Sequence, residues 1–278
     1  MATLIQSLQY ILETRDPALS NEFKRVLLKA ALQAYALEYL YNHPTYRRIN
    51  FYGGTCLHVV YGLNRLSEDL DLDNSVGVDL SHLKEDLLVY FQKTVGYPEA
   101  GASIQQGAAG ILRITLKFQI LNKLGLSAVS NETLHLKVEV TSHKQIAVVK
   151  KTPVFYHGRN FVPAHFSLET MMAGKMLACL ERNFQRGKEG TLIKGRDFYD
   201  LLWFMQTQVY PLEEKLSKEG RLPYTTKAAM LAIKEKVNSI KKKDLSADLM
   251  PLFESSAFVQ GWIDAFHANF SGYLQTYL

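Results

Sequence analysis

The stretch Phe51-Tyr52-Gly53-Gly54-Thr55, followed by Arg65-Leu66-Ser67-Glu68-Asp69-Leu70-Asp71, decides the fold of this chain of 278 residues. It predicts a strand, a glycine turn, a short helix, and a second strand that carries two carboxylates. Residues i and i+2 of a strand project from the same face, so Asp69 and Asp71 are placed to bind one divalent cation together. Glycines that open a helix present free N–H groups and the positive end of the helix dipole, which suit a phosphate. This combination indicates phosphoryl or nucleotidyl transfer.

The composition is that of an ordinary globular protein. Hydrophobic residues make up 47% and charged residues 21%, and the length allows one large core or two small ones. The cysteines Cys56 and Cys179 form no CxxC pair, which argues against a zinc site or disulfide framework and fits a reducing compartment. No segment has the ~18 apolar residues that span a bilayer, so we expect a cytoplasmic protein without membrane association. The net charge of +5 permits nucleic-acid binding without requiring it.

Hydrophobic patterning predicts an α/β half followed by a helical half. In the first half we expect helices over residues 20–41, 55–61 and 80–94, and strands over 48–52, 68–72, 111–120 and 134–140. In the second half we expect helices over 167–182, 197–208, 212–219, 225–240 and 257–277, with a basic loop at 187–190. The predicted fold class is α/β (α+β), with a catalytic domain over residues 1–160 and a helical domain over residues 161–278 that completes the active site.

Further polar residues accompany the paired aspartates. Arg65 and Ser67 precede the strand, where a guanidinium and a hydroxyl suit the β- and γ-phosphates of a nucleotide. The hydroxyl of Thr55 contributes at the helix start or only caps the helix. Glu139 lies on the polar face of its predicted strand; it is either a third metal ligand, which a two-metal site needs, or a surface glutamate.

The helical half contains one lysine on an apolar helix and one charged segment. Lys175 stands among methionines and either extends to solvent or clamps a phosphate. Asp197 and Asp200 lie three residues apart at a helix start, near one face, where a helix N-terminus favours carboxylates. Arg196 beside this pair indicates a buried ionic cluster or a site.

The glycine turn with its Asp-x-Asp resembles the signature of the nucleotidyltransferase superfamily. More narrowly, residues 53–57 and 65–72 resemble the AbiEii/AbiGii family, the toxin halves of bacterial toxin–antitoxin and phage-exclusion systems. The family lysine on the first helix after the sheet is matched by Lys175. A later Lys-x-Arg-Asp-x-x-Asp-Leu segment is matched by Lys194, Arg196, Asp197, Asp200 and Leu201.

This resemblance implies a nucleotidyltransferase-like mixed sheet and transfer of NMP from an NTP to an acceptor, with Mg²⁺ or Mn²⁺ and release of pyrophosphate. It implies a metal site of Asp69, Asp71 and Glu139, and Asp197 as the base. The implied nucleotide-binding residues are Gly53, Gly54, Thr55, Arg65, Ser67, Lys175, Lys194 and Arg196.

Relatives in the family modify the 3′ end of tRNA, so the resemblance implies tRNA or other RNA as the acceptor and a cognate antitoxin as a partner. The basic side chains available for RNA, which are equally consistent with a solvated surface, are Lys144, Lys150, Lys151, Arg186, Lys188 and Lys194.

Two alternatives stay open. One is an enzyme that transfers a nucleotide to a protein side chain or a small molecule. The other is a non-catalytic module that binds a nucleotide or a partner protein. The presence of Asp69, Asp71, Lys175 and Asp197 counts against the second alternative.

Overall fold

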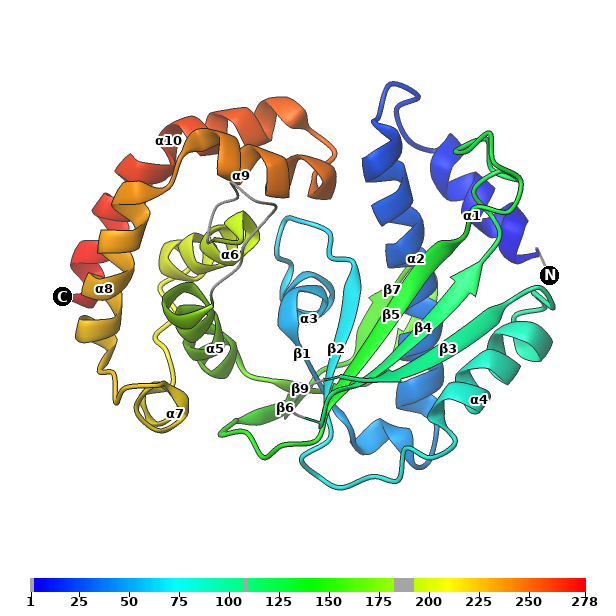
Figure 1. Cartoon of the computed structure of the whole chain (residues 1–278), viewed down its shortest axis with the longest axis horizontal. Helices are drawn as coiled ribbons and strands as arrows, with labels where there is room; N and C mark the ends of the chain where they lie inside the picture. Colours follow the sequence, from blue (N-terminus) through cyan, green and yellow to red (C-terminus); the bar gives the residue numbers. More distant parts are fainter. Residues whose placement is uncertain (1–2, 108–109, 183–192) are drawn as a thin grey trace. The chain divides into compact units, whose positions relative to one another are not determined.

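The computed structural model describes residues 3–107, 110–182 and 193–278 (Figure 1). The chain divides into two compact units. Unit 1 comprises Met1–Lys144 and Lys150–His165, and unit 2 comprises Gln145–Val149 and Phe166–Leu278. The predicted functional division at residues 160 and 161 stays a prediction, and the predicted loop at 187–190 lies outside the described residues.

Unit 1 contains a mixed sheet with helices beside it. Its helices are α1 (Leu4–Glu13), α2 (Asn21–Asn42), α3 (Gly53–Tyr61) and α4 (Leu83–Val89), with a 3-10 turn at Tyr46–Arg48 and a π-helical turn at Tyr90–Thr94. The sheet strands are β1 (Asn50–Tyr52), β2 (Asp69–Asp73), β3 (Gly101–Gln106), β4 (Leu112–Phe118), β5 (Leu134–Thr141), β6 (Val149–Lys151) and β9 (Ala164–Phe166). They lie in the order β3-β4-β5-β2-β1-β9-β6, and β7 (Val154–Tyr156) and β8 (Arg159–Phe161) form a separate hairpin.

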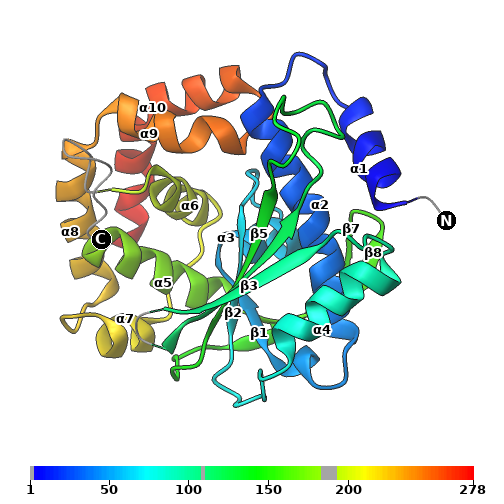
Figure 2. The ribbon, with the colours of Figure 1, turned by 45° about the vertical axis from the view of Figure 1, so that its right-hand side comes forward.

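The two faces of this sheet differ in polarity because its central strands alternate. Every second residue of β4 and of the first part of β5 is buried, as the sequence pattern predicts. On β2 the buried Leu70 and Leu72 alternate with the half-buried Asp69 and Asp71. Helix α2 packs against β5 and α4 packs against β3 (Figure 2). The apolar face is thus covered, and the opposite face carries the carboxylates of β2.

Unit 2 is helical. Its helices are α5 (Leu168–Glu181), α6 (Gly195–Gln206), α7 (Glu213–Glu219), α8 (Thr226–Ser239), α9 (Lys242–Leu249) and α10 (Ser256–Leu274). The side chain of Ser167 caps α5 by accepting from the backbone N–H of Thr170, as predicted. Among the described residues of the whole chain, no helix is both long enough and apolar enough to cross a membrane.

The predicted fold class is confirmed: a mixed α/β sheet with flanking helices, followed by a helical part. The element bounds differ from the prediction in places. The helix expected from residue 80 begins at Leu83, with His82 as the N-cap residue, and α6 ends at Gln206, before Pro211. Helix α1, strand β3, the short strands β6 to β9, and helix α9 were not predicted.

Candidate functional site

The glycine turn lies directly against the second aspartate of β2. Gly53 is the first residue of α3 and has φ +80°, a left-handed conformation that favours glycine. A Cβ atom built on Gly53 lies 2.1 Å from Oδ2 of Asp71. Strand β1 pairs with β2 so that Tyr52 is opposite Asp71, which brings the turn and the carboxylate together. The close approach therefore depends on a residue without a side chain at position 53.

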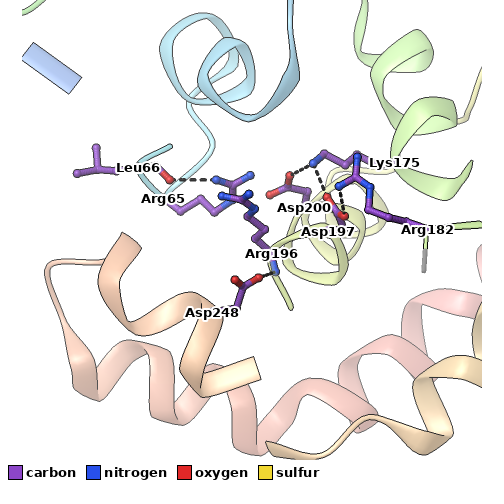
Figure 3. Close-up of polar contacts among 8 residues, drawn as sticks. All are labelled: Arg65, Leu66, Lys175, Arg182, Arg196, Asp197, Asp200 and Asp248. Atoms are coloured by element: carbon purple, nitrogen blue, oxygen red, sulfur yellow. Dashed lines mark hydrogen bonds and ion pairs between the residues drawn. The ribbon is translucent and has the colours of Figure 1, made fainter. Parts of the chain in front are cut away.

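The second glycine of the turn contacts the two polar residues that precede β2. A Cβ atom on Gly54 lies 2.7 Å from Nη2 of Arg65 and 2.9 Å from Oγ of Ser67. Both side chains belong to buried residues, and Nη1 of Arg65 donates to the carbonyl of Leu66 at 2.9 Å (Figure 3). The guanidinium adds its positive charge to the N-terminal end of α3, whose first N–H groups have no partner within the helix. This end of α3 suits a phosphate.

Thr55 connects α3 to β2. Its hydroxyl donates to the carbonyl oxygen of Asp69 at 2.6 Å, and the residue is 1% exposed. The hydrogen bond fixes the helix start to the strand that carries both aspartates. The Thr55 hydroxyl does not cap α3 but links the helix to β2, and its contribution to nucleotide binding stays a prediction.

Glu139 stands beside Asp71 but is bound by an arginine. Strands β2 and β5 are parallel, with Asp71 opposite Glu139, and β4 pairs with β5 so that Arg113 is opposite Glu139. Residues opposite one another share a face of the sheet, so the three side chains form one row. Nε of Arg113 lies 2.6 Å from Oε1 of Glu139, and this hydrogen bond raises the pKa of Arg113.

Asp69 and Asp71 on β2 suit a divalent cation better than the predicted set of Asp69, Asp71 and Glu139 does. Asp69 and Asp71 offer hard oxygen donors from one face, the ligands that Mg²⁺ and Mn²⁺ take. Glu139 instead pairs with Arg113. Throughout the described ranges, no group of three or more His, Cys, Asp or Glu side chains is arranged to hold a metal ion. The Asp69–Asp71 pair fits the ion, and the third ligand stays a prediction.

Unit 2 brings its predicted residues together at the start of α6. Nζ of Lys175, on α5, lies 2.8 Å from Oδ1 of Asp197 and 2.8 Å from Oδ2 of Asp200 (Figure 3). The side chains are 16%, 4% and 0% exposed, respectively, so two buried carboxylates share one ammonium group. Lys175 therefore does not extend to solvent, and the sequence prediction of a buried ionic cluster here is what the structure shows.

A second cation holds Asp197 in its ionised form. Nη1 of Arg182, at the end of α5, lies 2.9 Å from Oδ2 of Asp197. Burial acts to raise the pKa of Asp197, but the charges of Lys175 and Arg182 outweigh it and lower the pKa to about 2. In this arrangement the carboxylate is a weak base.

Positive charge accumulates around the same helix start. Burial lowers the pKa of Lys194, and the nearby charges of Arg196 and Arg182 lower it further. The backbone N–H of Arg196 donates to Oδ2 of Asp248 at 3.0 Å, so an acid from α9 satisfies the N-terminus of α6. A Cβ atom on Gly195 lies 3.1 Å from Cα of Leu245, which explains a glycine at this contact. Crowded cations of this kind attract an anion such as a phosphate.

Three residues of these clusters were missed from the sequence. Arg113 pairs with Glu139, Arg182 with Asp197, and Asp248 with the Arg196 N–H. Of these three, only Arg113 could have been placed from the sequence, because the alternating pattern puts it on the same strand face as Thr115 and Lys117. Of the predicted RNA contacts, Lys144, Lys150 and Lys151 are exposed and Lys194 is half-buried, whereas Arg186 and Lys188 lie outside the described residues.

Two comparisons with known proteins give similarities over most of this chain. A family model described as "Nucleotidyl transferase AbiEii toxin, Type IV TA system" matches residues 35–270. Among solved structures, the chain is similar to one described as "putative nucleotidyltransferase from H. pylori", with 17% identity and a TM-score of 0.53. The similarity covers 90% of this chain and 95% of that one; at such identity it shows a shared fold. A comparison with curated proteins gives no significant match.

Proposed function

The chain belongs to the AbiEii family of nucleotidyltransferase toxins, and from this premise we propose that it transfers NMP from an NTP to an RNA acceptor, with release of pyrophosphate. The observation that carries the proposal is the contact of Gly53 and Gly54 with Asp71, Arg65 and Ser67. It joins a phosphate-binding helix start to a pair of metal-binding carboxylates. Nucleotidyl transfer needs these two features side by side.

The proposed reaction is an in-line displacement at the α-phosphorus of the NTP. An acceptor hydroxyl oxygen forms a bond to this phosphorus, the bond to the bridging oxygen of the β-phosphate breaks, and pyrophosphate leaves with that oxygen. Asp69 and Asp71 would hold Mg²⁺ or Mn²⁺, which supplies charge neutralisation at the α-phosphate and the leaving pyrophosphate. The N–H groups at the start of α3, with Arg65 and Ser67, bind and orient the phosphates.

From unit 2 we propose Lys175, Lys194 and Arg196 as phosphate ligands and Asp197 as the base that takes the proton of the acceptor hydroxyl. In this proposal the ion pairs of Asp197 control its basicity. Phosphate oxygens that recruit Lys175 and Arg182 remove the charges that lower its pKa, while its burial continues to raise it. The carboxylate thus becomes a better base when the nucleotide is bound.

We propose the 3′ end of tRNA as the acceptor and an antitoxin as a cellular partner. Both come from the family, and the exposed Lys144, Lys150 and Lys151 support an RNA acceptor through phosphate contacts. The cytoplasm is the compartment that supplies tRNA and NTPs together.

The test is transfer of label from each of the four NTPs to total tRNA in the presence of Mg²⁺. The purified chain is compared with Asp69→Ala, which removes a metal ligand, and with Asp264→Ala, a matched change at an exposed carboxylate that pairs with Lys242. We expect label on tRNA with the unchanged chain and with Asp264→Ala, and none with Asp69→Ala.

Other outcomes would redirect the proposal. Pyrophosphate release without labelled tRNA, in a reaction supplied with cell extract, would replace RNA by a protein or small-molecule acceptor. Full activity of Asp69→Ala would refute the metal site. No transfer from any NTP to any acceptor would leave a nucleotide-binding or partner-binding module as the function.

A further inference from the structure

Unit 1 contains a cavity that none of the predicted catalytic residues lines. Its volume is about 760 Å³, within the range of small-molecule sites. Its lining residues belong to α1, α2, the turn after α4, and β8, the strand packed beside α2. These elements are labelled in Figure 2. We call it the α2 pocket; its lining includes Leu4, Tyr35, Glu38, Tyr39, His43, Tyr90 and Arg159.

Aromatic rings form much of the wall of the α2 pocket. The ring of Tyr39 lies 4.8 Å from that of Tyr90, centroid to centroid, and 5.5 Å from that of His43. The guanidinium of Arg159 lies over the ring of Tyr35 at 4.0 Å. Flat faces of this kind stack with flat ligands, and proteins that bind unpaired bases use tyrosine, histidine and arginine in this way.

In the α2 pocket, one carboxylate oxygen of Glu38 accepts hydrogen bonds and the other accepts none from the described residues. Oε2 of Glu38 accepts from the hydroxyl of Tyr90 at 3.0 Å and from Nη1 of Arg159 at 3.2 Å. Oε1 accepts from no residue that the structure describes. Within the same described part, Nε of Arg159 is buried without a hydrogen-bond partner. The pocket thus offers an acceptor to a ligand that donates an N–H group, next to a donor that is not satisfied.

Charges of both signs lie around the α2 pocket, since Asp86 accepts from the hydroxyl of Tyr46 at 2.6 Å and its charge contributes to the raised pKa of Tyr39. Arg159 already neutralises Glu38, so the pair presents little net charge. The 3-10 turn that follows His43 and Pro44 carries Arg47 and Arg48, both exposed. A flat ring that donates an N–H matches the aromatic wall and Oε1 of Glu38, and the exposed Arg47 and Arg48 on the neighbouring turn are available to a phosphate attached to such a ring.

We propose that the α2 pocket binds a nucleobase, stacked on Tyr39 and donating an N–H to Oε1 of Glu38. Two sources carry this chemistry: an unpaired base of the RNA acceptor, and a free nucleotide. The first source rests on the proposed function, because that function includes an RNA substrate. Binding of a free nucleotide in the α2 pocket does not depend on the proposed function.

The test measures binding rather than transfer. The full chain is titrated by calorimetry with each nucleoside monophosphate and with a short single-stranded RNA, in EDTA so that no metal ion assists binding at Asp69 and Asp71. The variants are Tyr39→Leu, which keeps apolar volume but removes the ring, and Glu38→Gln, which keeps the shape. Tyr10→Leu, at a tyrosine that is 67% exposed and outside the pocket, is the matched control.

We expect saturable binding that Tyr39→Leu and Glu38→Gln each weaken on the order of tenfold, and that Tyr10→Leu leaves unchanged. Tighter binding of RNA than of every monophosphate identifies RNA as the source, and equal affinity identifies free nucleotide. Absence of binding, or equal affinity in all three variants, overturns the proposal. Loss of binding in Tyr39→Leu counts only if its melting temperature matches that of Tyr10→Leu; otherwise Glu38→Gln decides. A chain that binds bases here but transfers no nucleotide refutes the proposed function alone.

Discussion

Replacing Lys175 by methionine tests whether one ammonium group stabilises two buried carboxylates. Its Nζ lies 2.8 Å from both Asp197 and Asp200, whose side chains are 4% and 0% exposed. Methionine keeps the length and apolar character of the lysine stem but removes the charge. Asp197 keeps Arg182 as a partner, and both carboxylates lose the charge of Lys175. The carboxylates must then either protonate or remain charged in a poorly solvated site.

The structure sets the size of the effect. Breaking a buried ion pair by removing one partner costs roughly 3–5 kcal/mol of unfolding free energy. For a chain of this size, each kcal/mol lowers the melting temperature by roughly 2–4 °C, so we expect a drop on the order of 10 °C. The same substitution at Lys218, in an exposed pair with Glu214, is expected to cost about 1 kcal/mol or less.

The assay is thermal unfolding at neutral pH of the unchanged chain, Lys175→Met and Lys218→Met. A fourth protein combines Lys175→Met with Asp197→Asn and Asp200→Asn, which removes the buried charges, and we expect it to recover much of the lost stability. If Lys175→Met melts no lower than Lys218→Met, then the two carboxylates do not depend on the lysine. The explanation given for the low pKa of Asp197 would fail with it.

Four further predictions follow from the same geometry. Gly53→Ala places a methyl group against Asp71, so nucleotide transfer should fall about 100-fold or more in a steady-state assay, and unchanged rates would contradict the contact. The pKa of Asp197 falls from 3.8 to about 2 on folding, so this group adds about 2 kcal/mol of stability above pH 3.8 that is lost as the pH falls toward 2. Denaturant unfolding from pH 5 to 2 should show that loss in the unchanged chain and not in Asp197→Asn. Chelation by EDTA should abolish transfer and added Mg²⁺ restore it, and activity that survives EDTA would exclude the metal. Because Arg113 holds Glu139, we expect Glu139→Gln to reduce kcat about tenfold at most, and Asp71→Asn to abolish it; equal losses would make Glu139 a ligand.

The sequence predicts the parts of this molecule that local patterns determine. The glycine turn and the Asp-x-Asp strand are adjacent in the chain, and alternation assigns Asp69 and Asp71 to one face without any tertiary information. The cap at Ser167 is likewise a local signal for α5. By contrast, β3 has the sequence Gly-Ala-Ser-Ile-Gln-Gln, in which only Ile104 strongly favours a strand, and β3 forms because it pairs along β4.

The partners within the clusters depend on register and packing, which sequence spacing does not specify. Arg113 meets Glu139 only because β4 and β5 pair in one particular register. The spacing of Arg182 and Asp197 in the sequence does not predict their distance in the fold. Asp248 lies on α9, a helix that was not predicted. The α2 pocket combines side chains from four distant segments and has no counterpart in any sequence motif.

The discontinuous make-up of unit 2 has a consequence for synthesis on the ribosome. Its first segment, Gln145–Val149, emerges before Lys150–His165, which belongs to unit 1. This short segment cannot make its contacts with Lys215 until about seventy more residues have been synthesised. Nζ of Lys215 donates to Oε1 of Gln145 and to the carbonyl oxygen of Ile146. A fragment that starts after residue 160 would lack these acceptors and leave Lys215, which is 4% exposed, with Glu219 alone. The nascent chain contains all of unit 1 once residue 165 is made, but unit 2 cannot be expressed intact as a C-terminal fragment that begins after that residue.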